Sequence, residues 1–146
     1  AVVMTSNPEG VPPVLLHHFK HNKTLHQRVV LLSILGEKRP EVADERKVAV
    51  TDLGQGFFRV VARFGFMETP QISTVLRLCG GHGLPFEIGV TTFVLGRETL
   101  LATGRSPLAR WRKRLYVLLA RNAPSAAAFF DIPPNRVVEL GTQIEL

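Results

Sequence analysis

Four histidines near the start of the chain have types and spacing that could do chemistry: His17, His18, His21 and His26. His17 and His21 stand four residues apart, so on a helix they share one face, as two metal ligands can. His18 holds the place of the general-base glutamate in an HExxH motif, and no cysteine or acidic cluster lies nearby to complete a site. We therefore expect no metal site, and interpret the histidines and Lys20 as polar or cationic groups near a helix carboxyl end.

A second candidate site is a run of basic residues: Arg105, Arg110, Arg112, Lys113 and Arg114. Ser106 and Pro107 predict that a helix begins within this run. Exposed cations in the first turns oppose the helix dipole by about 0.3 to 1 kcal/mol each, so local stability does not explain them. One interpretation is an anion-binding site for membrane headgroups or a nucleotide phosphate. The other is a solvated face paired with acids elsewhere, and both stay open.

Catalytic groups are harder to assemble. The acidic residues are scattered, and none pairs by spacing with a histidine or with a serine in a nucleophile elbow. They include Asp52, Glu68, Glu87, Glu98, Asp131 and Glu139. Cys79 falls on the apolar stripe of a predicted helix, which favours a core position over a nucleophile. We predict no enzyme activity, no catalytic residue and no cofactor.

The elements that position these residues begin with a predicted βαβ unit. Residues 1–5 predict a short buried strand, residues 14–22 a helix, and residues 28–35 a strand buried on both faces. Residues 47–53 and 57–66 then predict two arms of an antiparallel hairpin, because Gly54-Gln55-Gly56 between them is followed by strand-like alternation and not by a helix. The alternation places Phe58, Val60, Ala62 and Phe64 on the core side of the second arm.

The second half of the chain continues to alternate helices and strands. Thr69 and Pro70 predict a helix start, and Gly80 and Gly81 predict its end. Residues 90–95 and 136–145 predict strands, and residues 107–122 and 125–130 predict helices. We therefore predict a single α/β domain, residues 1–146, with a mixed sheet of about six strands, an initial βαβ unit, an antiparallel hairpin and flanking helices.

Composition limits the classes of function. The chain of 146 residues is 45% hydrophobic, has a net charge of +6 and has a pI near 10.2, so it should fold as one domain and attract anions. We predict no nucleic-acid partner, because no recognition motif accompanies the charge. The single cysteine fits a reducing compartment, no stretch reaches the ~18 to 20 apolar residues of a bilayer span, and the first residues do not resemble a signal peptide.

Four long segments resemble the C-terminal hydrophilic domain of the bacterial KUP/HAK/KT family of potassium uptake proteins. They are LLHHFKHNKTLHQRVVLLSI (15–34), DLGQGFFRVVARFGFMETP (52–70), FVLGRETLLATG (93–104) and IPPNRVVELGTQIEL (132–146). They occur in the family's order and cover nearly the whole chain. The resemblance implies a domain at the cytoplasmic face of the inner membrane, within a potassium/proton symport protein whose ion and proton sites lie in a separate membrane part.

The resemblance also implies what such a domain does. It implies a structural or regulatory role in assembly or activity, with the transporter's own transmembrane domain and a second copy in a homodimer as partners. Anionic lipid headgroups are a further partner that the charge suggests. The alternative function is a sensing module that binds an adenine nucleotide or a cyclic dinucleotide near Arg105 and the basic helix start.

Overall fold

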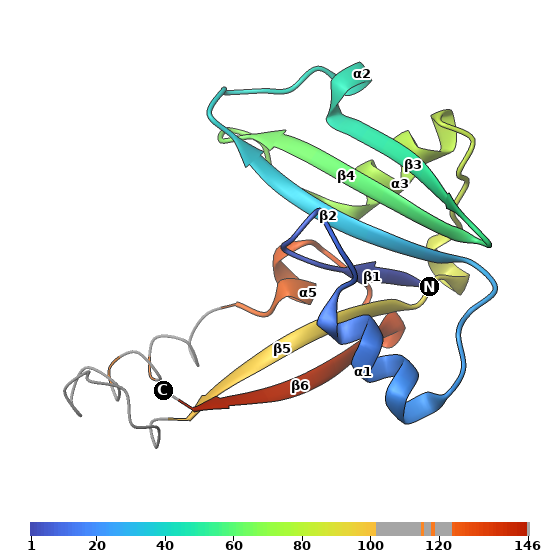
Figure 1. Ribbon diagram of the computed structural model, residues 1–146. Coiled ribbons are helices and arrows are strands. Elements are labelled where there is room, and N and C mark those ends of the chain that lie inside the picture. Colours follow the sequence, from blue (N-terminus) through green and yellow to red (C-terminus); the bar gives the residue numbers. More distant parts are fainter. Residues whose placement is uncertain (102–114, 116–117, 119–123, 146) are drawn as a thin grey trace.

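Six strands form one mixed sheet in the computed structural model, which describes residues 1–101, 115, 118 and 124–145 (Figure 1). The strands are β1 (Val2–Met4), β2 (Val29–Glu37), β3 (Val48–Gly54), β4 (Phe57–Gly65), β5 (Phe93–Leu101) and β6 (Val137–Glu145). Their spatial order is β3-β4-β2-β1-β5-β6, with β3 antiparallel to β4 and the other neighbouring pairs parallel. The predicted mixed sheet, parallel opening unit and hairpin are therefore confirmed.

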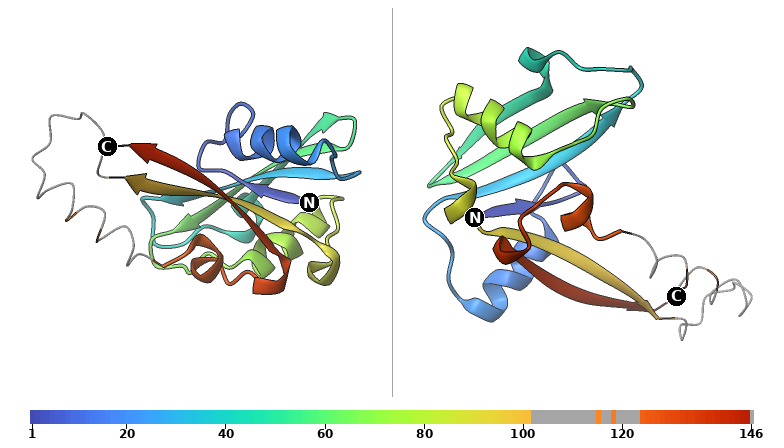
Figure 2. Two further views of the ribbon diagram at one scale, coloured as in Figure 1. Left: turned by 90° about the horizontal axis from the view of Figure 1, so that it is seen from below. Right: turned by 180° about the vertical axis from the view of Figure 1, so that it is seen from behind.

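Helices lie on both faces of this sheet. The α-helices are α1 (Pro13–Asn22), α2 (Asp44–Lys47), α3 (Ile72–Gly81) and α5 (Ala126–Phe129), and the 3₁₀ turns are η1 (Ile88–Val90) and η2 (Pro134–Arg136). The left view of Figure 2 shows α1 on one side of the sheet and α3 with α5 on the other. Within the described ranges, no helix combines the length and the apolar composition of a bilayer span.

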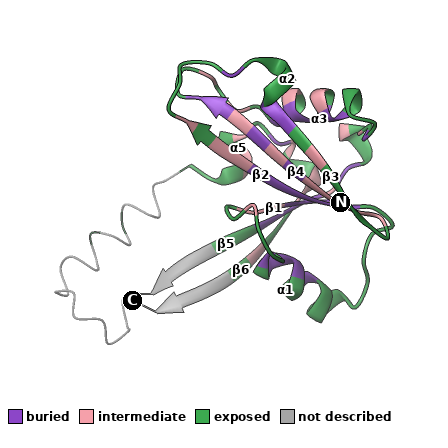
Figure 3. Ribbon diagram, turned by 45° about the horizontal axis from the view of Figure 1, so that its top comes forward, coloured by how far each residue is buried: buried purple, intermediate pink, exposed green. Residues whose placement is uncertain are grey.

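The core is divided by the sheet into two layers. The larger layer lies under α3, where Val60, Ala62 and Phe64 of β4 pack with Ile72 and Cys79. The smaller layer lies under α1 and is made by Val3, Val14, Leu15, Val29, Leu31 and Val94. Figure 3 shows that burial follows the inner sides of these elements, while the outer side of α1 is exposed. The predicted core face of β4 and the predicted core position of Cys79 are both confirmed.

The hairpin turn confirms the interpretation of the two glycines. Gly54, Gln55 and Gly56 have φ angles of 83°, 53° and 84°, a left-handed conformation that glycine adopts at little cost. At Gly56 a Cβ atom would also lie 2.5 Å from the carbonyl oxygen of Gln27. The close approach of Gly56 to the chain before β2 allows a hydrogen bond at the start of that strand, in which the Val29 amide donates to the Gly56 carbonyl at 2.9 Å.

An ion-pair cluster fixes the edge of the sheet next to α3. The Lys47 ammonium lies 2.8 Å from Glu68 Oε1 and 2.9 Å from Asp44 Oδ1, and its side chain is only 10% exposed. The second oxygen of Glu68 accepts from the amides of Gly65 at 2.7 Å and Val42 at 3.0 Å. These hydrogen bonds, with that from Lys47 the largest cause, lower the pKa of Glu68, and the bond to Glu68 raises the pKa of Lys47. The cluster joins the β2–β3 connection to the end of β4.

Several element boundaries differ from the predicted ones, and helix α2 (Asp44–Lys47) was not predicted. Helix α3 begins at Ile72 and not at Thr69–Pro70, because the Ile72 amide donates to the carbonyl of Phe130 at 3.0 Å, a tertiary contact that replaces a local cap. Strand β5 begins at Phe93 and continues to Leu101, since β6 pairs with it along that whole length. Of the helix predicted for residues 107–122, the structure describes Leu115 and Leu118, which are helical and exposed.

Candidate functional site

The sheet opens into a gap where its central strand stops. Strand β1 has three residues, whereas β2 and β5 on either side of it have nine each. Beyond Met4 the two long strands run away from each other, as Figure 1 shows. The neighbouring strands β1 and β5 are followed by strands on opposite sides, since β1 leads to β2 and β5 leads to β6. Ligands of open α/β sheets bind at the carboxyl ends of strands at such a switch point.

Two cavities occupy this gap, one on each face of the sheet. The cavity on the α1 side has a volume of about 480 Å³, and the one on the α5 side about 290 Å³. Met4, Thr5, Ser6 and Gly96 line both. We call the larger cavity the β1 cleft, and its lining is Met4, Thr5, Ser6, Pro12, Pro13, Val14, His17, His21, Gly96, Arg97, Leu140 and Gly141.

The loop between β1 and α1 forms one wall of the β1 cleft and is held by local hydrogen bonds. Thr5 Oγ1 accepts from the amide of Asn7 at 3.2 Å, and Asn7 Oδ1 accepts from the amide of Glu9 at 2.9 Å. Farther along, the Arg59 guanidinium on β4 donates to the Gly10 carbonyl at 3.0 Å. The wall is therefore fixed at several points before any ligand enters.

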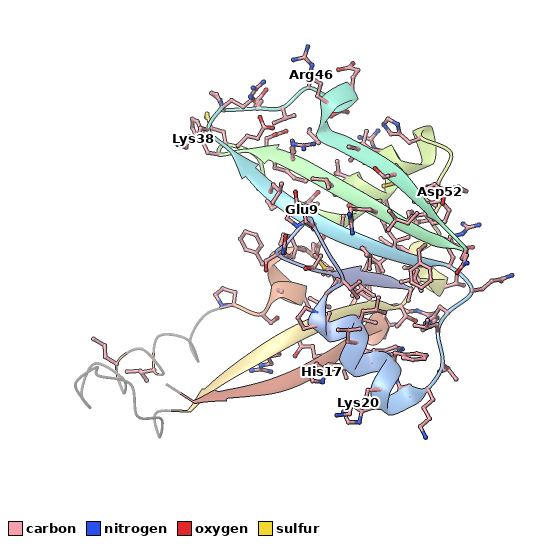
Figure 4. The ribbon with its side chains drawn as sticks, in the orientation of Figure 1. Glu9, His17, Lys20, Lys38, Arg46 and Asp52 are labelled. Atoms are coloured by element: carbon pink, nitrogen blue, oxygen red, sulfur yellow. The ribbon has the colours of Figure 1, made fainter. Side chains whose placement is uncertain are left out.

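The histidines separate into two pairs with different surroundings. His17 and His21 are exposed, line the β1 cleft and lie with ring centroids 6.5 Å apart at an interplanar angle of 11°. Figure 4 shows His17 and Lys20 projecting from α1. His18 is buried, with Nδ1 3.1 Å from Asn22 Nδ2, and its ring stacks on His26 at 6.1 Å. Among the described residues, no group of three or more His, Cys, Asp or Glu side chains could hold a metal ion.

Hydrogen-bonding side chains line part of the β1 cleft. His17 and His21 bring imidazole groups to it, and Thr5 and Ser6 add hydroxyl groups. The Arg97 side chain lies on the opposite face of the sheet, because the neighbouring Gly96 faces Val14 of α1 and successive strand residues alternate. No carboxylate belongs to its lining within the described part of the chain. Glu139 approaches Arg97 at 3.4 Å, and the Arg97 side chain remains 69% exposed. The cleft can form hydrogen bonds with a ligand, but its lining residues show no nucleophile with an adjacent base.

The basic run chosen from the sequence lies outside the described residues. Arg105, Arg110, Arg112, Lys113 and Arg114 all belong to that part of the chain, so their proposed ligand role stays a prediction. Cys79, in contrast, is 1% exposed, and burial raises the pKa of its thiol to about 11, which opposes nucleophilic chemistry.

Sequence reasoning missed the two glycines that line the cleft on β5 and β6, Gly96 and Gly141. Gly96 and Gly141 interrupt β5 and β6 at almost the same level, since Gly96 pairs with Leu140 and Arg97 with Gly141. A glycine inside a strand can mark a place where another group approaches the backbone. The matching segments LGR and LGT, at residues 95–97 and 140–142, were the available signal.

Comparison with known proteins identifies relatives along the full chain. The chain is 57% identical over 146 residues to the probable potassium transport system protein Kup of Myxococcus xanthus (strain DK1622). It is 56% identical over 151 residues to the protein of that name from Anaeromyxobacter dehalogenans (strain 2CP-C), and 50% identical over 146 residues to Kup 2 of Syntrophobacter fumaroxidans (strain DSM 10017 / MPOB). No solved structure matches the chain.

These alignments cover all of this chain but little of the relatives. The matched part is 22% of the first two proteins and 23% of the third. The model of one protein family, described as the K+ potassium transporter C-terminal domain, also matches residues 1–146. This chain therefore belongs to the K+ potassium transporter C-terminal domain family.

Proposed function

We propose that this chain is the cytosolic C-terminal domain of a bacterial proton-coupled potassium uptake transporter, and that it assists the assembly or regulates the activity of that transporter. The observation that carries the proposal is the family match over residues 1–146, in which the chain aligns with less than a quarter of each named relative. The remaining length of such proteins would hold the membrane domain and the ion pathway. This domain would then act on transport without binding potassium itself.

The packing of the domain supports an appended module. Both core layers are closed within the chain, with side chains such as Val2, Ile72 and Phe93 fully buried. A body with its own core can move or dock as a unit beneath a membrane domain. Its proposed partners are its own transmembrane domain, a second copy in a homodimer, and anionic lipid headgroups attracted by the net charge of +6.

Potassium uptake tests this proposal directly. Rubidium uptake would be measured in cells that lack other potassium uptake systems. The cells would express either the full-length transporter or a form from which this C-terminal domain is deleted. At equal amounts in the membrane, we expect the truncated form to have lower uptake or a different dependence on external rubidium. Equal uptake by the two forms would reject a role in assembly or regulation.

A second candidate function is nucleotide sensing, with an adenine nucleotide or a cyclic dinucleotide as ligand. The observation that favours it is the cleft at the switch point, a position where α/β sheets bind ligands. Arg105 follows the end of β5 by four residues in sequence, as the last strand residue is Leu101. Calorimetric titration with a panel of nucleotides should show binding that the Arg105→Ala substitution weakens. Absence of heat across the panel would remove this candidate.

A further inference from the structure

We propose that the outer face of helix α1 docks against an anionic lipid bilayer. We define the α1 outer face by Leu16, Phe19 and Lys20 of the helix and by Lys23, which caps its end. Their spacing of i, i+3, i+4 and i+7 places them along one side of the helix. The inference rests on the proposed function, which makes this chain part of a membrane transporter, and it names the surface that meets the lipid.

Two large apolar side chains on this face are open to solvent. Leu16 is 58% exposed and Phe19 is 51% exposed, whereas Val14 and Leu15 of the same helix are buried in the smaller core layer. Figure 3 shows the outer side of α1 as exposed. A single exposed leucine is ordinary on a protein surface. A leucine and a phenylalanine one helical turn apart, beside lysines, form the pattern of helices that lie in a membrane interface.

The segment that carries this face has charges of one sign. Residues 10–36 contain Lys20, Lys23, Arg28 and four histidines, and no aspartate or glutamate. None of the ion pairs formed among the described residues involves Lys20 or Lys23. Cations near a helix carboxyl end offset the helix dipole, but the dipole does not account for the apolar side chains between them. A surface that mixes lysines with exposed apolar groups is complementary to anionic headgroups above an acyl layer.

The end of α1 lies close to the point where residue 1 joins the sheet. The Ala1 amino group donates to the carbonyl of Arg28 at 2.7 Å, and a short connection joins Arg28 to Asn22, the last residue of α1. Under the proposed function the membrane domain precedes this domain in the chain, so it enters at Ala1. A tether at that point raises the effective concentration of the bilayer at the α1 outer face, so that a weak contact suffices.

Flotation of the 146-residue chain with lipid vesicles tests the proposal. Vesicles of phosphatidylcholine alone would be compared with vesicles made of equal parts of phosphatidylcholine and phosphatidylglycerol. The ionic strength would be kept low, because salt screens the attraction between exposed charges. We expect the chain to float with the anionic vesicles and not with the neutral ones. Absence of flotation with the anionic vesicles would overturn the proposal.

Two pairs of matched variants test the location. Phe19→Ser and its control Phe66→Ser each remove one exposed phenylalanine. Lys20→Gln and its control Lys38→Gln each remove one exposed charge. The control residues follow the ends of β4 and β2, outside the α1 outer face. One lysine near an anionic surface changes affinity by about fivefold, so Lys20→Gln should weaken binding by that factor. Phe19→Ser should weaken binding by at least a similar factor, and the controls should leave it unchanged. Equal weakening by a variant and its control would overturn the proposal.

The same variants recognise a different occupant of this face. A dimer that Phe19→Ser dissociates in sedimentation velocity, in a chain that does not float, would assign the face to a second copy and overturn the lipid proposal. The result is also separate from the test of the proposed function. Flotation that Phe19→Ser weakens supports the docking face even where removal of the domain leaves rubidium uptake unchanged. Absent flotation rejects the docking face even where that removal changes uptake.

Discussion

Removal of the Glu68 carboxylate should cost a large part of the stability of this domain. In the Glu68→Ala variant, Lys47 loses its 2.8 Å ion pair, and the amides of Gly65 and Val42 lose their acceptor. Breaking one partner of a fully buried ion pair costs about 3 to 5 kcal/mol, and this range is an upper bound here because the Glu68 side chain is 17% exposed. Asp44 stays 2.9 Å from Lys47, so the lower part of that range is expected.

The loss can be measured by urea unfolding followed by circular dichroism, and by the unfolding temperature. A loss of about 3 kcal/mol should lower the unfolding temperature of a domain of this size by roughly 10 °C. Glu45→Gln is the matched control, because Glu45 is an exposed residue of the same short helix α2 as Asp44 and should change stability by less than about 0.5 kcal/mol. A loss below about 1 kcal/mol for Glu68→Ala relative to this control would refute the reasoning.

Three further predictions follow from single residues. The hydrogen bond from Lys47 lowers the pKa of Glu68 in the folded chain. Glu68 should therefore contribute fully to the free energy of unfolding above the ordinary carboxyl pKa, and this contribution should fall as the pH drops through the pKa of Glu68 in the folded chain. Urea midpoints between about pH 7 and pH 3 should fall more steeply in the wild type than in Glu68→Ala, in which Asp44, whose pKa Lys47 also lowers, still contributes. Because the pKa of the Cys79 thiol is raised to about 11 and the thiol is buried, it should react slowly with a thiol reagent at neutral pH and quickly in urea; fast reaction of the folded chain would contradict this. Gly54→Ala should lower the free energy of unfolding by about 1 to 2 kcal/mol, because φ is positive at this position. Gly56→Ala should lower it clearly more, because its Cβ atom would also lie 2.5 Å from the carbonyl oxygen of Gln27. Equal losses for the two variants in urea unfolding would contradict this prediction.

Much of the fold could be predicted because local patterns and tertiary structure agree. The alternation in residues 57–65 places Val60, Ala62 and Phe64 in the core. The valine and leucine run at 29–32 is buried, as expected of a strand between parallel neighbours. The predicted start of α3 was wrong because the amide of its first residue, Ile72, donates to the carbonyl of Phe130, nearly sixty residues away in sequence. No local signal reports such a contact.

The site could not be predicted because it is created by strand lengths and not by a motif. The sequence predicts a short first strand, but it does not show that β2 and β5 extend past that strand on both sides. This extension brings Gly96 to the same cleft as His17 and His21, which lie about eighty residues earlier. Sequence reasoning instead selected the densest charge run, Arg105 to Arg114, which lies outside the described residues.

Rubidium uptake by the full-length protein at increasing temperature tests most directly whether this domain acts on transport. The Glu68→Ala and Glu45→Gln forms would be compared in the interval where the separate Glu68→Ala domain has unfolded and the Glu45→Gln domain has not. At equal amounts in the membrane, we predict that uptake by the Glu68→Ala form falls below that of the other form within this interval. Two superimposed uptake curves would contradict the proposed role.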